Sequence, residues 1–486
     1  MLLQFVILYL IVSVGIGLYA ATKVKNSADF VVAGRHLPLP FIVATVFATW
    51  FGSETVLGIP AKFLNEGLKG VVADPFGSSM CLIFVGLFFA RPLYRMGLLT
   101  IGDFYRARYN RAVELAAAIC IVISYLGWVS AQVTALGLVF NILTEGALAP
   151  WQGMMIGVAI VLVYTLAGGM FSVAFTDLFQ MLIIGAGMVY IAAVVSGMAG
   201  GAGVVVEHAR AAGKLEFWPG LEPRDLIAFA AAWMTMALGS IPQQDVFQRV
   251  SAAKNENTAA LGSVLGGSIY FFFAFVPMFL AYSATLIDPK MVADLLAKDS
   301  QHILPRLILD HAPFAVQVMF FGALLAAILS CSSATLLAPS VTFAENVLRN
   351  FFPNITDDQF LRMLRIVVLL FALGVLAFAM TSNSTIYGMV ENAYKITLVA
   401  AFTPLAFGLY WKRATTQGAA AAMSLGLVTW LSLEFAAPDG FLPPQFAGLV
   451  AAIIGMVAGS LLPQRYGHPA SAAHRHPSGI IQQAKT

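Results

Sequence analysis

The chain has 486 residues, of which 59% are hydrophobic and 10% are charged. Soluble domains average about 45–50% apolar and about 25% charged residues, so this composition excludes an ordinary soluble protein and predicts a polytopic membrane protein. The net charge of +3 is too small to indicate a nucleic-acid-binding surface. The three cysteines lie in apolar segments without CxxC spacing, so no disulfide framework is expected: Cys81, Cys120 and Cys331.

Apolar segments of about 20 residues, the length that crosses a bilayer, recur along the whole chain. The first is not a cleavable signal, because no basic residue precedes it and Lys23 and Lys25 follow it. We expect an all-α protein with about thirteen spans, near residues 2–22, 38–64, 76–96, 113–143, 150–168, 174–200, 223–245, 262–288, 314–348, 360–380, 385–411, 416–437 and 444–463.

The distribution of Lys and Arg predicts the orientation of the chain. If the N-terminus is outside, most of the 27 Lys and Arg residues fall in inner loops, as the positive-inside rule requires. We therefore expect a cell-membrane protein with its C-terminus in the cytoplasm. Residues 1–463 form one transmembrane domain in this interpretation, and the polar segment 464–486 is a disordered cytoplasmic tail.

The second predicted span, residues 38–64, is interrupted near its middle. Gly52, Gly58 and Pro60 lie there, beside the ionisable Glu54. Gly is conformationally loose and Pro removes a backbone donor, so the helix is expected to open and leave carbonyl groups without partners. At membrane depth such backbone is tolerated only where it lines a cavity or contacts a ligand.

The seventh span, residues 223–245, carries a similar interruption at Gly239, Ser240 and Pro242. A single break is well explained by a simple kink. Two breaks at comparable depth in two halves of a membrane protein indicate instead the midplane binding site of a transporter.

Few ionisable residues lie inside the spans, and each is costly enough to mark a pathway or a pair. Glu391 and Lys395 are four residues apart on one helix and are spaced to pair with each other, although a role in substrate binding is equally open. Asp245 and Glu345 lie near cytoplasmic span ends, where gate or interface contacts are expected. The other embedded acids are Glu54, Asp74 and Asp177.

The ninth span carries the richest set of small polar residues, Ser330, Cys331, Ser332, Ser333 and Thr335. Such residues serve close helix packing in membranes, but hydroxyl oxygens also suit a hard cation, and both interpretations remain open. No HExxH, P-loop or GxSxG motif occurs and no histidine lies in mid-span, so an enzyme is not expected.

The chain resembles the sodium/solute symporter family over nearly its whole length, and looks most like the choline-transporting branch. The resemblance rests on GGMFSVAFTDLFQ (168–180), PQQDVFQRV (242–250), AAILSCSS (326–333) and GLYWKRAT (408–415). It implies two inverted five-helix repeats, spans 2–6 and 7–11, with one helix before them and two after. The corresponding segments are 1–37, 38–200, 223–411 and 412–463.

The resemblance also implies ion sites. The main sodium site would use the backbone carbonyls of Ala48, Phe51 and Ala327 and the hydroxyl of Ser330. The family usually has Ser or Thr at the next position, where this chain has Cys331, and a thiol is a poor ligand for a hard cation. A weaker second ion site would use Asp177 and Ser333.

Substrate contacts implied by the resemblance include three carboxylates close to two tryptophans. That combination suits a cationic or amine-bearing solute, through charge and cation–π attraction. The candidate residues are Trp50, Glu54, Thr55, Asp74, Ser78, Trp128 and Glu391.

The expected function is sodium-coupled uptake of a small organic solute by alternating access. Sodium serves as coupling ion, and no other cofactor and no obligate protein partner is expected. A proton-coupled symporter is a close alternative, because Cys331 weakens the case for sodium. A transporter-like solute sensor and a channel are more distant alternatives.

Overall fold

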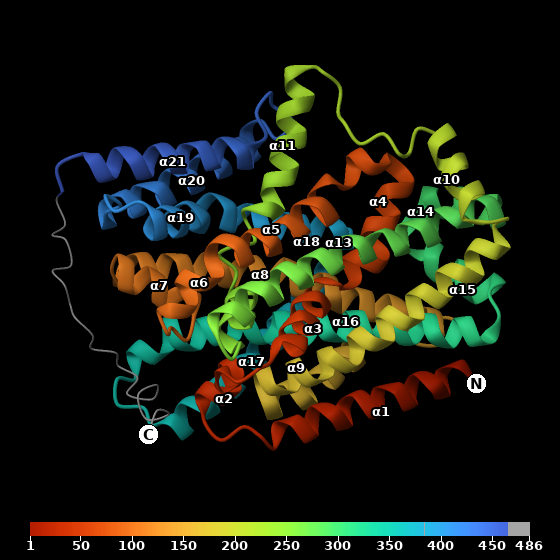
Figure 1. Ribbon diagram of the computed structural model, residues 1–486, viewed down its shortest axis with the longest axis horizontal. Helices are drawn as coiled ribbons and strands as arrows, with labels where there is room; N and C mark the ends of the chain where they lie inside the picture. Colours follow the sequence, from red (N-terminus) through yellow and green to blue (C-terminus); the bar gives the residue numbers. More distant parts are fainter. Residues whose placement is uncertain (383, 465–486) are drawn as a thin grey trace.

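The computed structural model describes residues 1–382 and 384–464 and is helical throughout these ranges, in which no β-strand occurs (Figure 1). The all-α prediction is therefore confirmed, whereas the predicted tail lies almost wholly outside the described residues. The α-helices are α1 (Leu2–Ala21), α2 (Ser27–Val32), α3 (Leu39–Trp50), α4 (Ile59–Glu66), α5 (Ser78–Phe84), α6 (Ala90–Arg95), α7 (Ile101–Arg108), α8 (Arg111–Leu143), α9 (Pro150–Met198), α10 (Ala202–Ala211), α11 (Pro223–Ala237), α12 (Gln244–Ala252), α13 (Glu256–Ile287), α14 (Pro289–Lys298), α15 (Ile303–His311), α16 (Phe314–Thr342), α17 (Asp357–Thr381), α18 (Ile386–Thr397), α19 (Thr403–Tyr410), α20 (Thr416–Ala436) and α21 (Pro444–Leu461).

Short 3-10 and π-helical segments connect or extend several of these helices. The 3-10 segments are Ala33–Arg35, Leu68–Val71, Ser300–His302 and Arg349–Phe351. The π-helical segments are Glu54–Gly58, Val72–Gly77, Val85–Phe89, Phe343–Leu348 and Leu398–Phe402. Since π-helical turns are frequent at functional sites, their presence in the second, third, ninth and eleventh predicted spans directs attention to those spans.

Ten helical stretches in the described ranges are long and apolar enough to cross a membrane, or eleven if the bent pair Leu39–Trp50 and Glu54–Glu66 is one span. The thirteen spans expected from the sequence differ from this number for two reasons. The 49-residue α9 counts once here, although two spans were expected there. In addition, α11 and α12, with 15 and 9 residues, are each too short to count.

A break inside α9 lies where the sequence predicts a boundary between two spans. Gly169 has φ 49° and ψ −132°, outside the helical region, and a Cβ there would lie 2.3 Å from the carbonyl oxygen of Phe30. Arg365 of α17 donates hydrogen bonds to the carbonyl oxygens of Leu166 and Ala167, at 2.9 and 3.3 Å. These bonds satisfy the end of the helical segment before the break.

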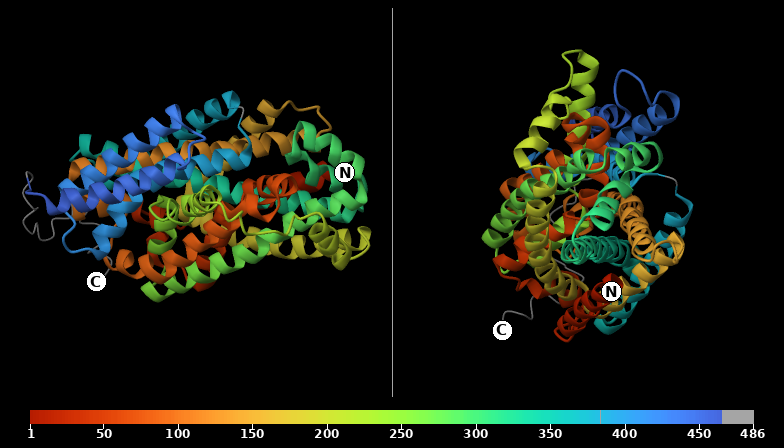
Figure 2. Two further views of the ribbon diagram at one scale, coloured as in Figure 1. Left: turned by 90° about the horizontal axis from the view of Figure 1, so that it is seen from above. Right: turned by 90° about the vertical axis from the view of Figure 1, so that its right-hand side faces the viewer.

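The helix α16 runs through the middle of the bundle, whereas α1 lies at its edge (Figure 2). In the most apolar part of α16, 67% of the residues are buried. In the corresponding part of α1, 17% are buried. Every residue from Ala323 to Thr342 is buried, so the small polar residues of the ninth predicted span all face other helices.

The first interruption lies between α3 and the π-helical segment that continues into α4. The backbone of Phe51 leaves the helical region at ψ 72°, the helix resumes at Glu54, and the two parts are bent by 52°. Gly52 lies in this interruption. Gly58 and Pro60 do not break the helix, because both lie beyond the interruption in helical backbone.

The second interruption, Leu238–Gln243, separates α11 from α12 and contains Gly239, Ser240 and Pro242. Every residue of α12 is buried. By contrast, the first half of α11 is largely exposed, and α11 stands across the direction of most other long helices at the top of Figure 1.

Candidate functional site

Three buried aromatic rings meet beside the first interruption. The rings of Trp50 and Tyr394 stack with centroids 6.0 Å apart, and the ring of Trp128 lies 5.5 Å from Trp50 and 5.4 Å from Tyr394. They come from α3, α18 and α8. All three side chains are at most 2% exposed. The three rings pack against one another in the interior, and the π faces of such rings attract cationic groups.

Glu54 belongs to the same group, which we call the aromatic–carboxylate cluster: Trp50, Glu54, Trp128, Gln132 and Tyr394. The carboxylate of Glu54 accepts hydrogen bonds from Trp128 Nε1 at 3.1 Å and from Gln132 Nε2 at 2.6 Å. Gln132 Oε1 accepts from the amide of Ser53 at 2.9 Å, so this side chain links the carboxylate of Glu54 to the backbone of the interruption. No Lys or Arg of the described residues forms an ion pair with Glu54 within 4 Å.

Three other predicted substrate residues, Thr55, Asp74 and Ser78, form a neighbouring polar group. Asp74 accepts hydrogen bonds from the hydroxyl of Ser78 and from that of Tyr270, the latter at 2.5 Å. The hydroxyls of Tyr270 and Thr55 are 3.2 Å apart. Since Thr55 follows Glu54 directly, the chain of contacts links the two acids, and Asp74 also lacks an ion-pair partner among the described Lys and Arg residues.

The residues predicted to hold sodium are all buried where α3 packs on α16. Ala48, Phe51, Ala327 and Ser330 have no measurable exposure. The amide of Ser53, which would continue the helix by bonding the carbonyl of Thr49, donates to Gln132 instead. The end of α3 thus has carbonyl oxygens available, which with a serine hydroxyl are the ligand type that a hard monovalent cation prefers.

Cys331 lies at the same point, because a Cβ on Gly52 would be 2.8 Å from Cys331 Sγ. The thiol therefore faces the interruption itself. Its sulfur is the one donor in this group that does not fit sodium.

Asp177 and Ser330, which the sequence assigns to two different ion sites, are direct neighbours. Ser330 Oγ donates to Asp177 Oδ1 at 2.5 Å, and the hydroxyl of Thr45 donates to the other carboxylate oxygen. Ser333 Oγ instead donates to the carbonyl of Ser330 at 2.9 Å. The two predicted sites are therefore one continuous polar region.

A buried arginine near this region was not singled out by the sequence analysis. The guanidinium of Arg249 is 2% exposed and donates to Thr49 Oγ1 at 2.9 Å and to the carbonyl oxygen of Asp245 at 3.1 Å. Asp245 is fully buried and accepts a hydrogen bond from the hydroxyl of Tyr125, so it belongs to this interior region as well as to a span end.

The predicted pairing of Glu391 with Lys395 is wrong. Lys395 Nζ lies 3.5 Å from Glu434 Oε1 on α20, and no ion pair joins it to Glu391 in the described part of the chain. Lys395 points from α18 toward α20, while Tyr394, the preceding residue, points toward Trp50 and Trp128. Glu391 is partly exposed and lies outside the aromatic–carboxylate cluster.

Several residues of the site were missed, although helical spacing would have found one of them. Gln132 lies four residues after Trp128 on α8. Residues three or four apart share a helix face. Tyr270 and Arg249 come from α13 and α12, and no local spacing connects them with Asp74 or Thr49.

A cavity of 580 Å³ approaches this site from one end of the bundle. It reaches Gly58, about one helical turn beyond Glu54. Gly58 packs against Tyr387, whose amide nitrogen would lie 3.2 Å from a Cβ at position 58. The cavity therefore ends at Gly58 and Tyr387, and the aromatic–carboxylate cluster behind them is closed. Charged and polar side chains line the cavity, among them Lys62, Glu66, Lys298, Asp299 and Gln301.

Comparisons with known proteins agree on one family. A family model described as the sodium:solute symporter family matches residues 30–426. The human high affinity choline transporter 1 is 27% identical over 455 residues, covering 88% of this chain and 75% of that protein. The osmoregulated proline transporter OpuE of Bacillus subtilis is 27% identical over 509 residues, covering 96% of this chain and 95% of that protein.

Solved structures share the fold. A Na+-coupled sialic acid symporter in a substrate-bound outward-open state superposes with a TM-score of 0.80 at 19% identity, covering 94% of this chain and 97% of that one. A nucleobase-cation-symport-1 family transporter, in a closed conformation with bromovinylhydantoin bound, gives a TM-score of 0.59 at 15% identity, covering 88% and 93% of the two chains. The arrangement of helices is therefore that of a transporter.

Proposed function

Because the chain belongs to the sodium:solute symporter family, we propose that it uses sodium to drive uptake of a small cationic or amine-bearing solute. Membership makes it a multi-pass membrane transporter and not an enzyme. The proposal concerns the solute and the residues that bind it. Choline is the first solute to test, because choline transporters are among the relatives; proline transporters also match, so a zwitterionic amino acid is the contrasting solute.

The observation that carries the proposal is the environment of Glu54. Its carboxylate lies among three aromatic rings and accepts hydrogen bonds only from neutral groups in the described structure. A buried carboxylate without a cationic partner is costly, and a cationic solute between these rings would supply the missing charge. Asp74 offers a second negative charge, and the hydroxyl of Tyr270 links it to Thr55, the residue after Glu54.

Sodium would hold α3 against α16. The carbonyls of Ala48, Phe51 and Ala327 and the hydroxyl of Ser330 are the proposed ligands. The Ser330 hydrogen is directed to Asp177, which leaves the oxygen lone pairs free for an ion. Ion binding would favour the form that is open to the side of the 580 Å³ cavity, and solute binding would then allow closure and inward release. One charge moving through 100 mV contributes about 2.3 kcal/mol, which sustains a solute gradient of roughly fiftyfold.

A proton-coupled symporter is the second candidate, and the observation that favours it is Cys331. Its thiol faces the interruption at Gly52, where the main sodium site is proposed. The buried acids Glu54, Asp74 and Asp177 would then carry the coupling protons.

The proposed topology has thirteen spans. In it α9 contributes two spans separated at Gly169, and α11 with α12 forms one interrupted span, so that spans 2–6 and 7–11 are inverted repeats. The N-terminus would be outside. Labelling of single cysteines introduced at the exposed positions Lys25 and Gly213 by a membrane-impermeant reagent tests this, because the two positions are expected on opposite sides.

The deciding experiment measures choline uptake into proteoliposomes under a sodium gradient, a potassium gradient and a pH gradient. We expect sodium-dependent uptake that falls about 10- to 100-fold in Glu54→Gln, the scale of a lost charge-assisted contact. Glu207→Gln, at an exposed glutamate of α10 that does not line the cavity, is the matched control. Uptake driven by the pH gradient alone would favour the proton-coupled candidate, and equal uptake by the Glu54 variant would contradict a cationic solute at this site.

A further inference from the structure

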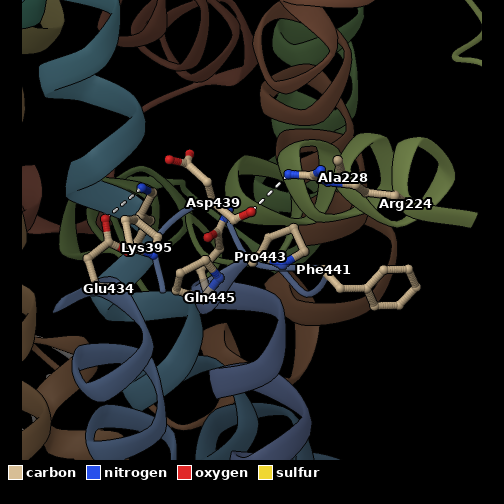
Figure 3. Close-up of a pocket in the computed structure, with 11 residues that line it drawn as sticks. Arg224, Ala228, Lys395, Glu434, Asp439, Phe441, Pro443 and Gln445 are labelled. Atoms are coloured by element: carbon tan, nitrogen blue, oxygen red, sulfur yellow. Dashed lines mark hydrogen bonds and ion pairs between the residues drawn. The ribbon is translucent and has the colours of Figure 1, made fainter. Parts of the chain in front are cut away.

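A second, separate pocket of 280 Å³ lies between α11, α18 and the loop that joins α20 to α21 (Figure 3). Its charged lining residues are two cations and two acids, Arg224, Lys395, Glu434 and Asp439. The pocket is therefore electrically balanced, and it draws its residues from three segments that are distant in sequence: α11, α18 and the α20–α21 pair with its connecting loop.

The hydrogen bonds and the ion pair within the pocket leave some of its charged groups available to a ligand. Arg224 Nη2 donates to the backbone carbonyl of Asp439 at 2.8 Å, so the Asp439 carboxylate is not used in that bond (Figure 3). Lys395 and Glu434 are 3.5 Å apart, which is long for a charge-assisted hydrogen bond. Glu434 Oε2 also accepts from Trp430 Nε1 at 3.0 Å. The described structure gives the Asp439 carboxylate no hydrogen bond or ion pair.

The surface around the pocket is apolar and exposed. In a chain that crosses a membrane, such a surface faces acyl chains. The loop between α20 and α21 joins two apolar helices and must lie near a membrane surface, at the level of lipid headgroups, where tryptophan is enriched. The exposed apolar side chains there are Leu226, Leu431, Phe435, Phe441 and Leu442.

We propose that this pocket binds the headgroup of a zwitterionic phospholipid with a primary ammonium group, such as phosphatidylethanolamine. The phosphate would lie between Arg224 and Lys395, and the ammonium would donate to the carboxylates of Asp439 and Glu434. The apolar side chains around the pocket would contact the acyl chains. A lipid bound in this way would join α11, whose first half is otherwise largely exposed, to α18 and the α20–α21 pair.

The lining residues also select among headgroups. Two carboxylates favour an ammonium that has N–H donors, whereas the trimethylated group of phosphatidylcholine has none and is bulkier. Phosphatidylglycerol supplies a phosphate but leaves both carboxylates without a cation. The chemistry thus distinguishes the proposed lipid from the other two without reference to the transported solute, so this proposal stands or falls separately from the function proposed above.

Native mass spectrometry of the purified full chain, titrated with each lipid, tests the proposal. We expect phosphatidylethanolamine to bind more tightly than phosphatidylcholine or phosphatidylglycerol, and Arg224→Gln and Asp439→Asn each to weaken its binding about tenfold. Both positions are exposed, so these variants are expected to fold. Arg210→Gln, at an exposed arginine of α10 away from the pocket, is the matched control and should leave binding unchanged.

Two outcomes would overturn the proposal. One is equal binding of the three lipids, or equal loss in the Arg210 and Arg224 variants, which would show only general contact with surrounding lipid. The other is displacement of bound phosphatidylethanolamine by comparable concentrations of soluble glycerophosphoethanolamine. That result would assign the pocket to a small soluble zwitterion instead of a membrane lipid.

Discussion

The backbone groups at the two interrupted helices find their hydrogen-bond partners in different ways. Between α3 and the π-helical segment at Glu54 the break is short, bent by 52° and braced by the single side chain of Gln132. Between α11 and α12 the break spans Leu238–Gln243, and its carbonyl at Gly239 accepts a hydrogen bond from Thr397 Oγ1 at 2.7 Å. The first break carries side chains suited to bind a cation, whereas the second is held by the side chain of Thr397 on α18.

The difference indicates a division of roles. Around the first break the charged groups are acids without a cation, Glu54 and Asp74. Beyond the second break the fully buried α12 carries Arg249, a cation that the protein itself supplies. We infer that the first break presents the site to its ligands and that the second holds a fixed internal charge.

The largest effect that would sharpen this comparison is expected from Arg249→Met. The change removes a buried cation and its hydrogen bonds to Thr49 and to the carbonyl oxygen of Asp245, and the loss of hydrogen bonds from a charged group costs about 3 kcal/mol of stability. We expect a clearly lower melting temperature of the detergent-purified protein. Arg91→Met, at an exposed arginine, is the control, and equal melting of the two variants would contradict a structural charge at position 249.

Glycine-to-alanine changes at the two breaks should differ in how much stability they cost. A Cβ at Gly239 would lie 2.3 and 2.6 Å from the backbone oxygens of Thr235 and Tyr394, which cannot move without the helices. A Cβ at Gly52 would meet side-chain atoms of Cys331 and Glu54 at 2.8 Å, and these can shift. We expect Gly239→Ala to destabilise the fold by about 1–3 kcal/mol.

For Gly52→Ala we expect a smaller loss of stability together with a larger loss of solute uptake, because Glu54 must move. Thermal melting and uptake, measured on both variants, separate the two effects. If Gly52→Ala proved the less stable of the two, the assignment of the second break as the rigid one would be wrong.

The sequence was sufficient for the helical fold and for the family, since both depend on apolar length and on ordered local motifs. It was also sufficient to place interruptions near Gly52 and Pro242. It was not sufficient for contacts between distant helices: Lys395 pairs with Glu434, 39 residues away, and not with its helical neighbour Glu391. Arg249 of α12 contacts Thr49 just before the first break, and no spacing rule within one helix reveals such a contact.

A more moderate effect is expected at the proposed sodium site from Cys331→Ser. Replacing the soft thiol by a hydroxyl oxygen supplies a ligand that suits sodium, so the sodium concentration for half-maximal effect should fall several-fold. Tryptophan fluorescence is a suitable measurement, because Trp50 lies next to Phe51. Cys120→Ser, at a buried cysteine of α8, is the control. Unchanged sodium dependence would place the ion elsewhere or favour proton coupling.

The smallest effect concerns the loop at Asp299, between α14 and α15 and outside the membrane-spanning helices. A hydrogen bond with His302 lowers the pKa of Asp299 to about 2, and Asp299 also accepts from Gln301, which in turn accepts from the amide of Ile386 at the start of α18. Because the folded pKa lies below the unfolded value, this contribution to stability is present above about pH 4 and is lost as the pH falls toward 2.

The Asp299 side chain is 42% exposed, so solvent screening keeps the contribution below about 1 kcal/mol. Asp299→Asn should therefore reduce the fall in melting temperature between pH 5 and pH 2.5 by only a small amount, about 1–2 °C. Asp294→Asn, at an exposed aspartate of α14, should leave that fall unchanged. Equal slopes for wild type and the Asp299 variant would mean that the loop is not held by this carboxylate.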